Sequence, residues 1–383
     1  MPKSVLFTVL STVFVDIVGF GMILPILPSH ATALGASPVM VGALVGSYSA
    51  IQFLLAPFWG RVSDRIGRRP VLLLGLAGSA VSYLLFALSG NLWVLLLSRL
   101  LDGGSGATIN VAQAYLADSS TPAARARAMG RIGAAVGMGF IVGPMLGGIT
   151  AARGVATVAW VAAVITAANL VVAWLRLPES PRIAARDEAP PVSAPVAQVR
   201  LPIAVLFLST LAFSVMYVVF PLWGEQALHA SRSTVSYWFA AMGLVTAIVQ
   251  GGVLGRVVDR VGETATARGG TAFLATGLAM LPLVQHSGQA GFYAVLFLLG
   301  AGYGLAGPAM LGLVSRDTGA ARQGRILGLA QSAASLARIV GPLLAGLVMG
   351  IAGADWAFVA SAAVAGTGLV MALVLGVRRM ARA

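Results

Sequence analysis

Apolar stretches about as long as a bilayer is thick recur along the whole chain. A helix needs about 20 mostly apolar residues to cross the hydrocarbon core. The composition agrees with membrane insertion, since 58% of the residues are hydrophobic and only 10% are charged. The sequence therefore predicts an all-α membrane protein with 12 transmembrane helices, at approximate residues 5–27, 40–61, 71–89, 92–116, 128–151, 154–175, 201–224, 234–257, 268–285, 290–314, 325–350 and 353–376.

Several chemistries are excluded by residues that the chain lacks. Without cysteine it has no disulfide, thiol nucleophile or thiolate metal site. Lys3 is the only lysine, which excludes a Walker A phosphate loop and a Schiff-base lysine within a bilayer segment. The three histidines fall in or near predicted outer loops, where we expect surface positions. We therefore expect neither an enzyme nor a bound metal or other cofactor.

The basic residues are distributed unevenly between the predicted loops. Of the 25 lysines and arginines, 21 fall on one side, in alternate loops and at the two termini. Arg153 and Arg232 fall on the other side, and Arg99 and Arg338 lie within predicted spans. Because cytoplasmic loops are the ones enriched in Lys and Arg, we expect a multi-pass protein of the cytoplasmic (inner) membrane with both termini in the cytoplasm. The net charge of +13 then orients the chain and does not indicate a nucleic-acid partner.

A polar stretch with five prolines divides the predicted spans six to six. We predict an N-terminal six-helix bundle at 1–178, a cytoplasmic linker at 179–200 and a C-terminal six-helix bundle at 201–383. Two motifs repeat across this linker, at offsets of 195 and 198 residues: Gly60-Arg-Val-Ser-Asp64-Arg65-Ile-Gly67-Arg68 with Gly255-Arg-Val-Val-Asp259-Arg260-Val-Gly262-Glu263, and Gly143-Pro144 with Gly341-Pro342. The repeats predict a duplicated unit, a plan in which substrates bind near the bilayer midplane.

Four motifs resemble those of the major facilitator superfamily, and more narrowly the twelve-span drug:proton antiporters that include tetracycline efflux pumps. They are Asp16-Ile-Val-Gly19-Phe-Gly21, the Gly60–Arg68 motif, Arg99-Leu-Leu-Asp102-Gly103, and Gly137-(five residues)-Gly143-Pro144-Met-Leu-Gly147-Gly148. The resemblance implies two pseudo-symmetric bundles that give alternating access to a central site. The ninth predicted span lacks the acidic residue that tetracycline pumps carry, which argues against tetracycline itself as the substrate.

A carboxylate in the middle of a predicted span is the clearest candidate for coupling. Asp16 lies roughly 16 Å into the first span at 1.5 Å per residue. A mid-span charge costs about 2.5 to 3.5 kcal/mol on insertion scales, so we expect Asp16 to face a cavity. A proton and a cationic substrate would each relieve its buried charge. The alternative is that Asp16 only hydrogen-bonds to a neighbouring helix.

Arg99 and Asp102 lie one helical turn apart in the fourth predicted span and can form an ion pair. Because a buried arginine stays charged, Arg99 can hold Asp102 or Asp16 ionised until a proton or substrate competes. This predicts proton coupling by Asp16, Arg99 and Asp102. The alternative is a static ion pair that fixes helix packing.

Arg338 lies roughly 20 Å into the eleventh predicted span and has no obvious partner there. It would attract an anionic group of the substrate, bridge to Asp16 or Asp102, or extend toward cytoplasmic water. Together with polar residues of other spans it completes the predicted substrate-binding set, which is Asp16, Asn110, Gln113, Tyr217, Gln331 and Arg338.

The repeated loop motifs predict a cytoplasmic gate. Asp64 and Asp259 would accept hydrogen bonds from amides at the starts of the eleventh and fifth spans and hold the cytoplasmic side shut. Gly60 and Gly67 would allow close helix approach and a tight turn. The predicted gating residues are Gly60, Asp64, Arg65, Gly67, Arg68, Asp259 and Arg260, and the predicted helix bends are at Gly143, Pro144, Gly341 and Pro342.

The predicted function is proton-coupled antiport that exports small amphipathic or drug-like molecules. The partners are then the substrate, protons and the lipid bilayer, and the protein acts as a monomer. One alternative is an exporter or uptake carrier of a sugar, metabolite or lipid-like anion on the same fold, with Arg338 central. Another is a transport-inactive sensor or scaffold, which would not need Asp16 or Arg99.

Overall fold

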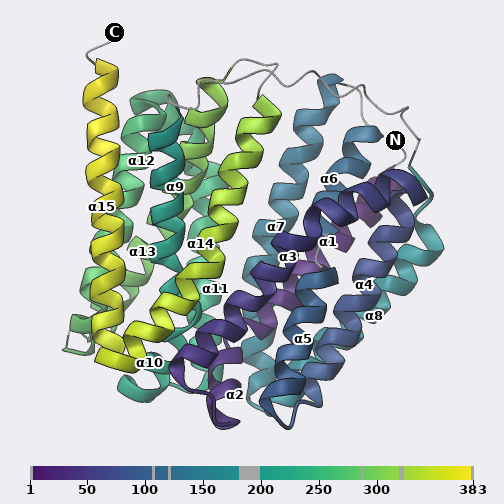
Figure 1. Cartoon of the computed structure of the whole chain (residues 1–383), viewed down its shortest axis with the longest axis horizontal. Coiled ribbons are helices and arrows are strands. Elements are labelled where there is room, and N and C mark those ends of the chain that lie inside the picture. The colour runs from purple at the N-terminus through teal and green to yellow at the C-terminus, as the bar shows by residue number, and fades with distance from the viewer. Residues whose placement is uncertain are drawn as a thin grey trace. The chain divides into compact units, whose positions relative to one another are not determined.

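The computed structural model describes residues 3–105, 108–119, 122–180, 199–286, 288–318 and 323–380. Within these ranges every regular element is a helix, as predicted (Figure 1). The first half contains α1 (Lys3–Ile23), α2 (Leu27–Ala33), α3 (Pro38–Ile66), α4 (Arg68–Ala87), α5 (Leu92–Ser105), α6 (Thr108–Asp118), α7 (Pro122–Ala151) and α8 (Val155–Arg176). The second half contains α9 (Arg200–Phe213), η2 (Ser214–Tyr217), α10 (Val219–Ala227), α11 (Arg232–Ile248), η3 (Val249–Val253), α12 (Leu254–Met280), η4 (Leu281–His286), α13 (Gly288–Arg316), α14 (Gln323–Ala352) and α15 (Ala354–Met380).

In the described part of the chain, 10 helical stretches are long and apolar enough to cross a membrane. Two causes explain the difference from the 12 predicted spans. The fourth predicted span is described as α5 and α6, of 14 and 11 residues, because residues 106 and 107 between them lie outside the described part of the chain. The eighth and ninth form one helical stretch, Arg232–Gln285, but the backbone inside it leaves the helical conformation at Gly262 (φ 79°, ψ 163°). This turn separates two passes.

The two halves turn at matching glycines. Gly67 precedes α4 with φ 106°, and Gly262 turns α12 with φ 79°, at the offset of 195 residues that relates the loop motifs. Gly154 precedes α8 with φ 110°, and Gly353 precedes α15 with φ 92°. Only glycine adopts such positive φ values without steric cost. The duplication predicted from the motifs therefore extends to the backbone conformation.

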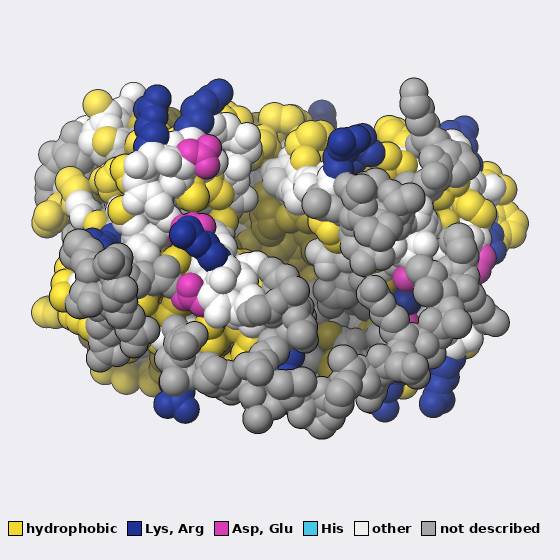
Figure 2. All heavy atoms as spheres, turned by 90° about the horizontal axis from the view of Figure 1, so that it is seen from above, with side chains coloured by type: hydrophobic (Ala, Val, Ile, Leu, Met, Phe, Trp, Pro, Cys, Tyr) yellow, Lys and Arg dark blue, Asp and Glu magenta, His cyan; other side chains and the backbone are white. Residues whose placement is uncertain are grey.

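The flanks of the helices are apolar and their ends are charged. Large hydrophobic side chains are widely exposed, among them Trp93 (80%), Ile351 (78%) and Phe7 (68%). Figure 2 shows dark-blue Lys and Arg and magenta Asp and Glu side chains on the face in view, with yellow hydrophobic side chains around it. Extensive exposed apolar surface of this kind marks contact with a membrane.

The contacts divide the chain into two units. Unit 1 comprises Met1–Ala36, Ser47–Ala189 and Ser231–Ala240, and unit 2 comprises Ser37–Gly46, Pro190–Ala230 and Ala241–Ala383. Each unit therefore includes a short segment from the other half of the sequence. In unit 2 the start of α3 packs on α14, where Gly42 lies against the backbone of Pro342. In unit 1 the start of α11 packs on α7, where the Tyr237 ring lies against Gly148.

Glycines on one face of α7 let this helix approach α1 closely in unit 1. A Cβ atom at Gly143 would lie 2.7 Å from the Val18 carbonyl oxygen and 3.0 Å from the Cα of Gly21. A Cβ at Gly147 would lie 3.0 Å from the Met22 carbonyl oxygen. The spacing of four residues places both glycines on one helix face, and small residues allow backbones to meet closely. α7 continues as a helix through Pro144, and α14 continues through Pro342.

The contact between α7 and α1 generates a stability prediction. Gly143→Ala should lower the free energy of unfolding by about 1–3 kcal/mol, because the added methyl group overlaps backbone atoms of α1. Gly130→Ala on the same helix is the control, since nothing lies within 4 Å of a Cβ there, and it should be neutral or slightly stabilising. Thermal unfolding of the purified variants checks this. Equal melting temperatures for the two variants would contradict the packing.

Candidate functional site

Three charged side chains are buried together in unit 1. Asp16 on α1 is 8% exposed, and Arg99 and Asp102 on α5 are each 2% exposed. Arg99 Nη1 lies 3.3 Å from Asp102 Oδ2, so the ion pair expected from their spacing forms. Asp16 is close enough to Asp102 for their charges to interact. The structure thus brings together the three residues that the sequence analysis selected for proton coupling.

One face of α4 frames this buried cluster. Ser79 Oγ donates a hydrogen bond to Asp16 Oδ1 at 3.4 Å. Tyr83, one turn further on, is 1% exposed and interacts electrostatically with the acidic residues. The Phe86 ring centroid lies 5.3 Å from the Arg99 guanidinium carbon, a cation–π contact. None of these three α4 residues was predicted as part of the site. Their spacing of four and three residues, which places them on one face of a predicted span, was the available signal.

The buried cluster is electrically unbalanced when its members are ionised. One guanidinium faces two carboxylates, so Asp16, Arg99 and Asp102 together carry a net charge of −1. Among the described residues, Arg99 Nε and Nη2 have no hydrogen-bond partner. An uncompensated buried charge is strongly destabilising, and arginine does not give up its proton. Adding one proton to a carboxyl group, or placing one cation beside it, therefore neutralises the cluster.

Unit 2 holds a half-buried arginine beside aromatic rings. Arg338 Nη2 donates to Ser335 Oγ at 3.0 Å, and Arg338 is close enough to Tyr217 to interact with it electrostatically. The Phe213 ring stacks on Tyr303 with centroids 4.1 Å apart and meets the Tyr217 ring edge-on at 5.6 Å. Two predicted substrate-binding residues, Tyr217 and Arg338, therefore share one neighbourhood within unit 2.

Three more predicted substrate-binding residues lie at exposed positions. Asn110 and Gln113 are one turn apart on α6 in unit 1, and Gln331 lies on α14 in unit 2. Their side chains are accessible to a molecule outside the unit to which each belongs. Their participation in binding stays a prediction.

Arg68 is the centre of an ion-pair network at the start of α4. Its Nη1 lies 2.6 Å from Asp64 Oδ1, and its Nε lies 3.0 Å from Asp118 Oδ2 at the end of α6. Gly67 makes the predicted tight turn. Among the described residues nothing lies within 4 Å of a Cβ at Gly60, and the close helix approach expected there stays a prediction. The predicted hydrogen bonds to Asp64 and Asp259 from amides at distant helix starts would join the two units, and they stay predictions. Four of the predicted gating residues are exposed: Asp64, Arg65, Asp259 and Arg260.

The second half repeats the Arg68–Asp118 ion pair with its charges exchanged. Glu263 matches Arg68 at the offset of 195 residues, and its Oε2 accepts a hydrogen bond from Arg316 Nη1 at 2.7 Å. Arg316 stands at the end of α13, 198 residues after Asp118 at the end of α6. No partner was predicted for Glu263 from the repeated motif. The reversal of charge at one position of the repeated motif was the signal that would have found this pair.

The expectation that the histidines lie at the surface was wrong for His30. This residue of α2 is half-buried, with Nε2 2.9 Å from Ser89 Oγ and its ring centroid 5.3 Å from that of Phe86. Burial and the positive charge of Arg232 lower the pKa of His30, so its imidazole is mainly neutral at pH 7. His229 is exposed as expected, and the side chain of His286 lies outside the described residues.

Comparison with known proteins decides the family. The model of the Major Facilitator Superfamily matches residues 9–342. The chain belongs to this superfamily. It is 35% identical over 343 residues to the class D tetracycline resistance protein of Salmonella ordonez, covering 86% of this chain and 85% of the relative. It is 30% identical over 369 residues to the class C tetracycline resistance protein of Escherichia coli, covering 92% of each. The crystal structure of the human organic anion transporter MFSD10 (TETRAN) superposes with a TM-score of 0.71 at 26% identity, covering 97% of this chain and all of that one.

Membership of the Major Facilitator Superfamily makes this chain a multi-pass membrane transporter of a small molecule and not an enzyme, as predicted. The resemblance to tetracycline efflux pumps is confirmed across most of the chain, and it supports a drug exporter. The family match also covers the repeated motifs and the two arginines within predicted spans, Arg99 and Arg338, since they fall between residues 9 and 342.

The exchanged ion pairs generate a charge-swap prediction. Arg68→Glu alone should destabilise unit 1, because it places three acidic groups together. Adding Asp118→Arg should restore part of the loss, since the second half natively pairs Glu263 with Arg316. We expect a favourable coupling of about 0.5–1 kcal/mol in a double-mutant cycle measured by thermal unfolding.

Arg61 supplies the control for this cycle, because it is exposed and its Nε donates to the Pro57 carbonyl of its own helix. Arg61→Glu should show no coupling to Asp118→Arg. Purely additive effects of Arg68→Glu and Asp118→Arg would contradict the assignment of this ion pair.

Proposed function

We propose that this transporter exports small amphipathic or drug-like molecules from the cytoplasm in exchange for protons. The observation that carries the proposal is the net charge of −1 on the buried cluster of Asp16, Arg99 and Asp102 when all three are ionised. A proton and a cationic substrate are alternative ways to neutralise the same site. Since each relieves the same electrostatic cost, binding of one favours release of the other, and this competition couples their movements.

The members of the cluster have distinct tasks in this proposal. Asp16 accepts the proton, because among the described residues it forms no ion pair and its carboxylate accepts a hydrogen bond from the neutral Ser79 hydroxyl. Arg99 keeps Asp102 ionised through their ion pair. The free carboxylate of Asp16 then attracts a cation, and the protonated form releases it.

Proton flow can supply the free energy for export. Each unit of pH difference is worth about 1.4 kcal/mol per proton, which corresponds to a tenfold concentration ratio at one proton per substrate. Export of this kind needs no nucleotide, in agreement with a sequence that has no Walker A loop.

The proposal includes a topology and a conformational cycle. The protein acts as a monomer in the inner membrane. Both of its termini lie in the cytoplasm, because arginines concentrate in alternate loops and at the termini. The predicted six-helix bundles 1–178 and 201–383, joined by the linker 179–200, then open to the two sides in turn. In this cycle the segments Asp64–Arg68 and Asp259–Arg260 serve as the cytoplasmic gate. The Gly143-Pro144 and Gly341-Pro342 segments shape the cavity.

A second candidate function keeps the fold and changes the charge of the substrate. Arg338 is half-buried beside Tyr217 and the stacked rings of Phe213 and Tyr303, a setting that fits an anionic group on an aromatic or amphipathic molecule. One structural relative is an organic anion transporter. In contrast, a transport-inactive sensor would gain nothing from burying Asp16 and Arg99 at an electrostatic cost.

The antiport proposal predicts a proton release that depends on Asp16. Adding the lipophilic cation tetraphenylphosphonium to purified protein in weak buffer should release protons, because the cation replaces the proton at the cluster. Asp16→Asn should abolish the release. Asp355→Asn, at an exposed position on α15, should leave it unchanged. A release of unchanged size in Asp16→Asn would remove Asp16 from the mechanism.

The anion alternative is tested with tetraphenylborate, which has nearly the shape of tetraphenylphosphonium and the opposite charge. If Arg338 binds the substrate, Arg338→Gln should weaken tetraphenylborate binding about tenfold, the loss expected when a cation–π contact with the phenyl rings of the anion is removed. Arg338→Lys should weaken it less. The exposed Arg153→Gln is the control. Tight binding of the cation and none of the anion would leave Arg338 without this role.

A further inference from the structure

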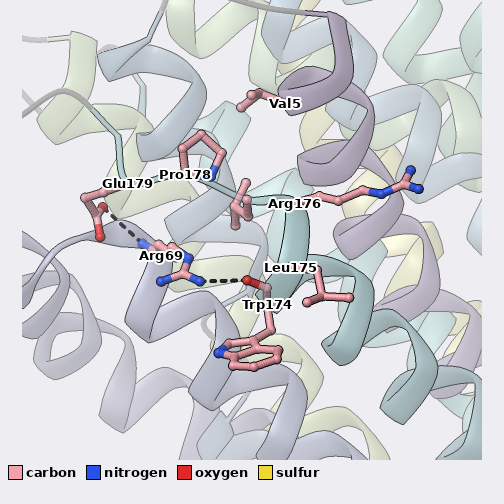
Figure 3. Close-up of a pocket in the computed structure, with 8 residues that line it drawn as sticks. Val5, Arg69, Trp174, Leu175, Arg176, Pro178 and Glu179 are labelled. Carbon is pink, nitrogen blue, oxygen red and sulfur yellow. Dashed lines mark hydrogen bonds between the residues drawn. The ribbon is translucent and has the colours of Figure 1, made fainter.

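A pocket outside the buried cluster lies where the ends of α1, α4 and α8 meet. Its volume is about 430 Å³, within the range of about 300–1,000 Å³ typical of small-molecule sites. Figure 3 shows the pocket with the chain leaving α8 across it. Its lining includes Val5, Arg69, Trp174, Leu175, Arg176 and Glu179.

The pocket contains the guanidinium groups of Arg69 and Arg176, which have N–H donors available for a ligand. Arg69 Nη2 donates to the Trp174 carbonyl oxygen at 2.7 Å, which anchors the guanidinium at the end of α8. Its Nε has no partner among the described residues. Arg176 is exposed and extends from the other side of the α8 end in Figure 3. An exposed side chain of this length changes rotamer rapidly, so Arg176 can fold over a ligand held at Arg69.

The one acidic residue of the pocket is already engaged. Glu179 Oε1 accepts hydrogen bonds from the backbone amides of Arg68 and Arg69 at 2.8 and 3.2 Å, and from Ser180 N at 3.0 Å. The carboxylate therefore caps the first turn of α4 and is held by the backbone. The two arginines keep the pocket positive after this acid is counted.

The edge of the pocket is apolar and open. Trp174 is 60% exposed and Leu175 is 68% exposed, both on the last turn of a helix that is apolar enough to span the membrane. Tryptophan at the end of a span marks the level of the lipid headgroups. A ligand in this pocket thus meets positive charge at one end and hydrocarbon-facing side chains at the other.

We propose that this pocket binds the phosphate of an anionic glycerophospholipid, with its acyl chains lying along Trp174 and Leu175. Guanidinium groups match the geometry of phosphate oxygens, and basic pockets at helix ends on the cytoplasmic side attract anionic headgroups. A soluble phosphate ester would share the headgroup contacts. It would leave the apolar edge unused, so the pocket favours the lipid.

The test uses full-length protein in nanodiscs and does not depend on transport, so its failure would leave the proposed function untouched. Dibrominated phosphatidylglycerol or dibrominated phosphatidylcholine is included at equal content, and quenching by bromine is assigned to Trp174 by subtracting the signal of Trp174→Phe. We expect phosphatidylglycerol to be preferred at this site by about fivefold for each arginine. The double variant Arg69→Gln/Arg176→Gln should lose the preference.

Further variants distinguish the loss of this site from misfolding of the protein. Arg69→Lys should retain most of the preference, and Arg176→Gln alone should reduce it about fivefold. Arg256→Gln is the matched control, because Arg256 is exposed and its Nη1 donates to the Gly252 carbonyl of a neighbouring turn. Equal quenching by the two lipids, or an unchanged preference in Arg176→Gln and in the double variant, would overturn the proposal. So would loss of the preference on adding millimolar glycerol 3-phosphate, since the site would then belong to soluble phosphates.

Discussion

The rest of the structure depends on the unbalanced charge buried in unit 1. Asp16, Arg99 and Asp102 sit on two helices, and burying them is favourable only if neighbouring helices hold them in place and supply polar contacts. α4 provides these contacts through Ser79 and Phe86, and its sequence is otherwise strongly apolar. The site is thus a small group of polar side chains within otherwise apolar membrane-spanning helices. The remaining net charge of −1 can be neutralised by a proton or a cation that enters and leaves the site.

A second constraint is the duplication of one six-helix plan within a single chain. The backbone repeats its positive-φ turns at Gly67 and Gly262 and again at Gly154 and Gly353, where any other residue would be strained. Side chains have been free to diverge around this frame. The buried acids belong to the first half, whereas the second half offers Arg338 and stacked rings. The two halves therefore share architecture and differ in chemistry.

The sequence predicted the helical class, the family and the burial of Asp16, Arg99 and Asp102, because span length and charge placement are strong signals in a bilayer. It also separated the eighth and ninth spans, between which the backbone turns at Gly262. Partners brought from other helices were missed. The Ser89 contact of His30 and the Glu263–Arg316 pair join residues 53 or more positions apart, beyond the reach of periodicity.

The exchanged polarity of the ion pairs has a consequence for assembly of the chain. Two similar halves emerge in succession and could pair helices with the wrong copy. If α4 met the end of α13, Arg68 would face Arg316, and if α12 met the end of α6, Glu263 would face Asp118. Both encounters would bring like charges together, whereas the native pairings bring opposite ones. The reversal of sign at one repeated position therefore disfavours contacts between helices of different halves, while each native contact remains attractive.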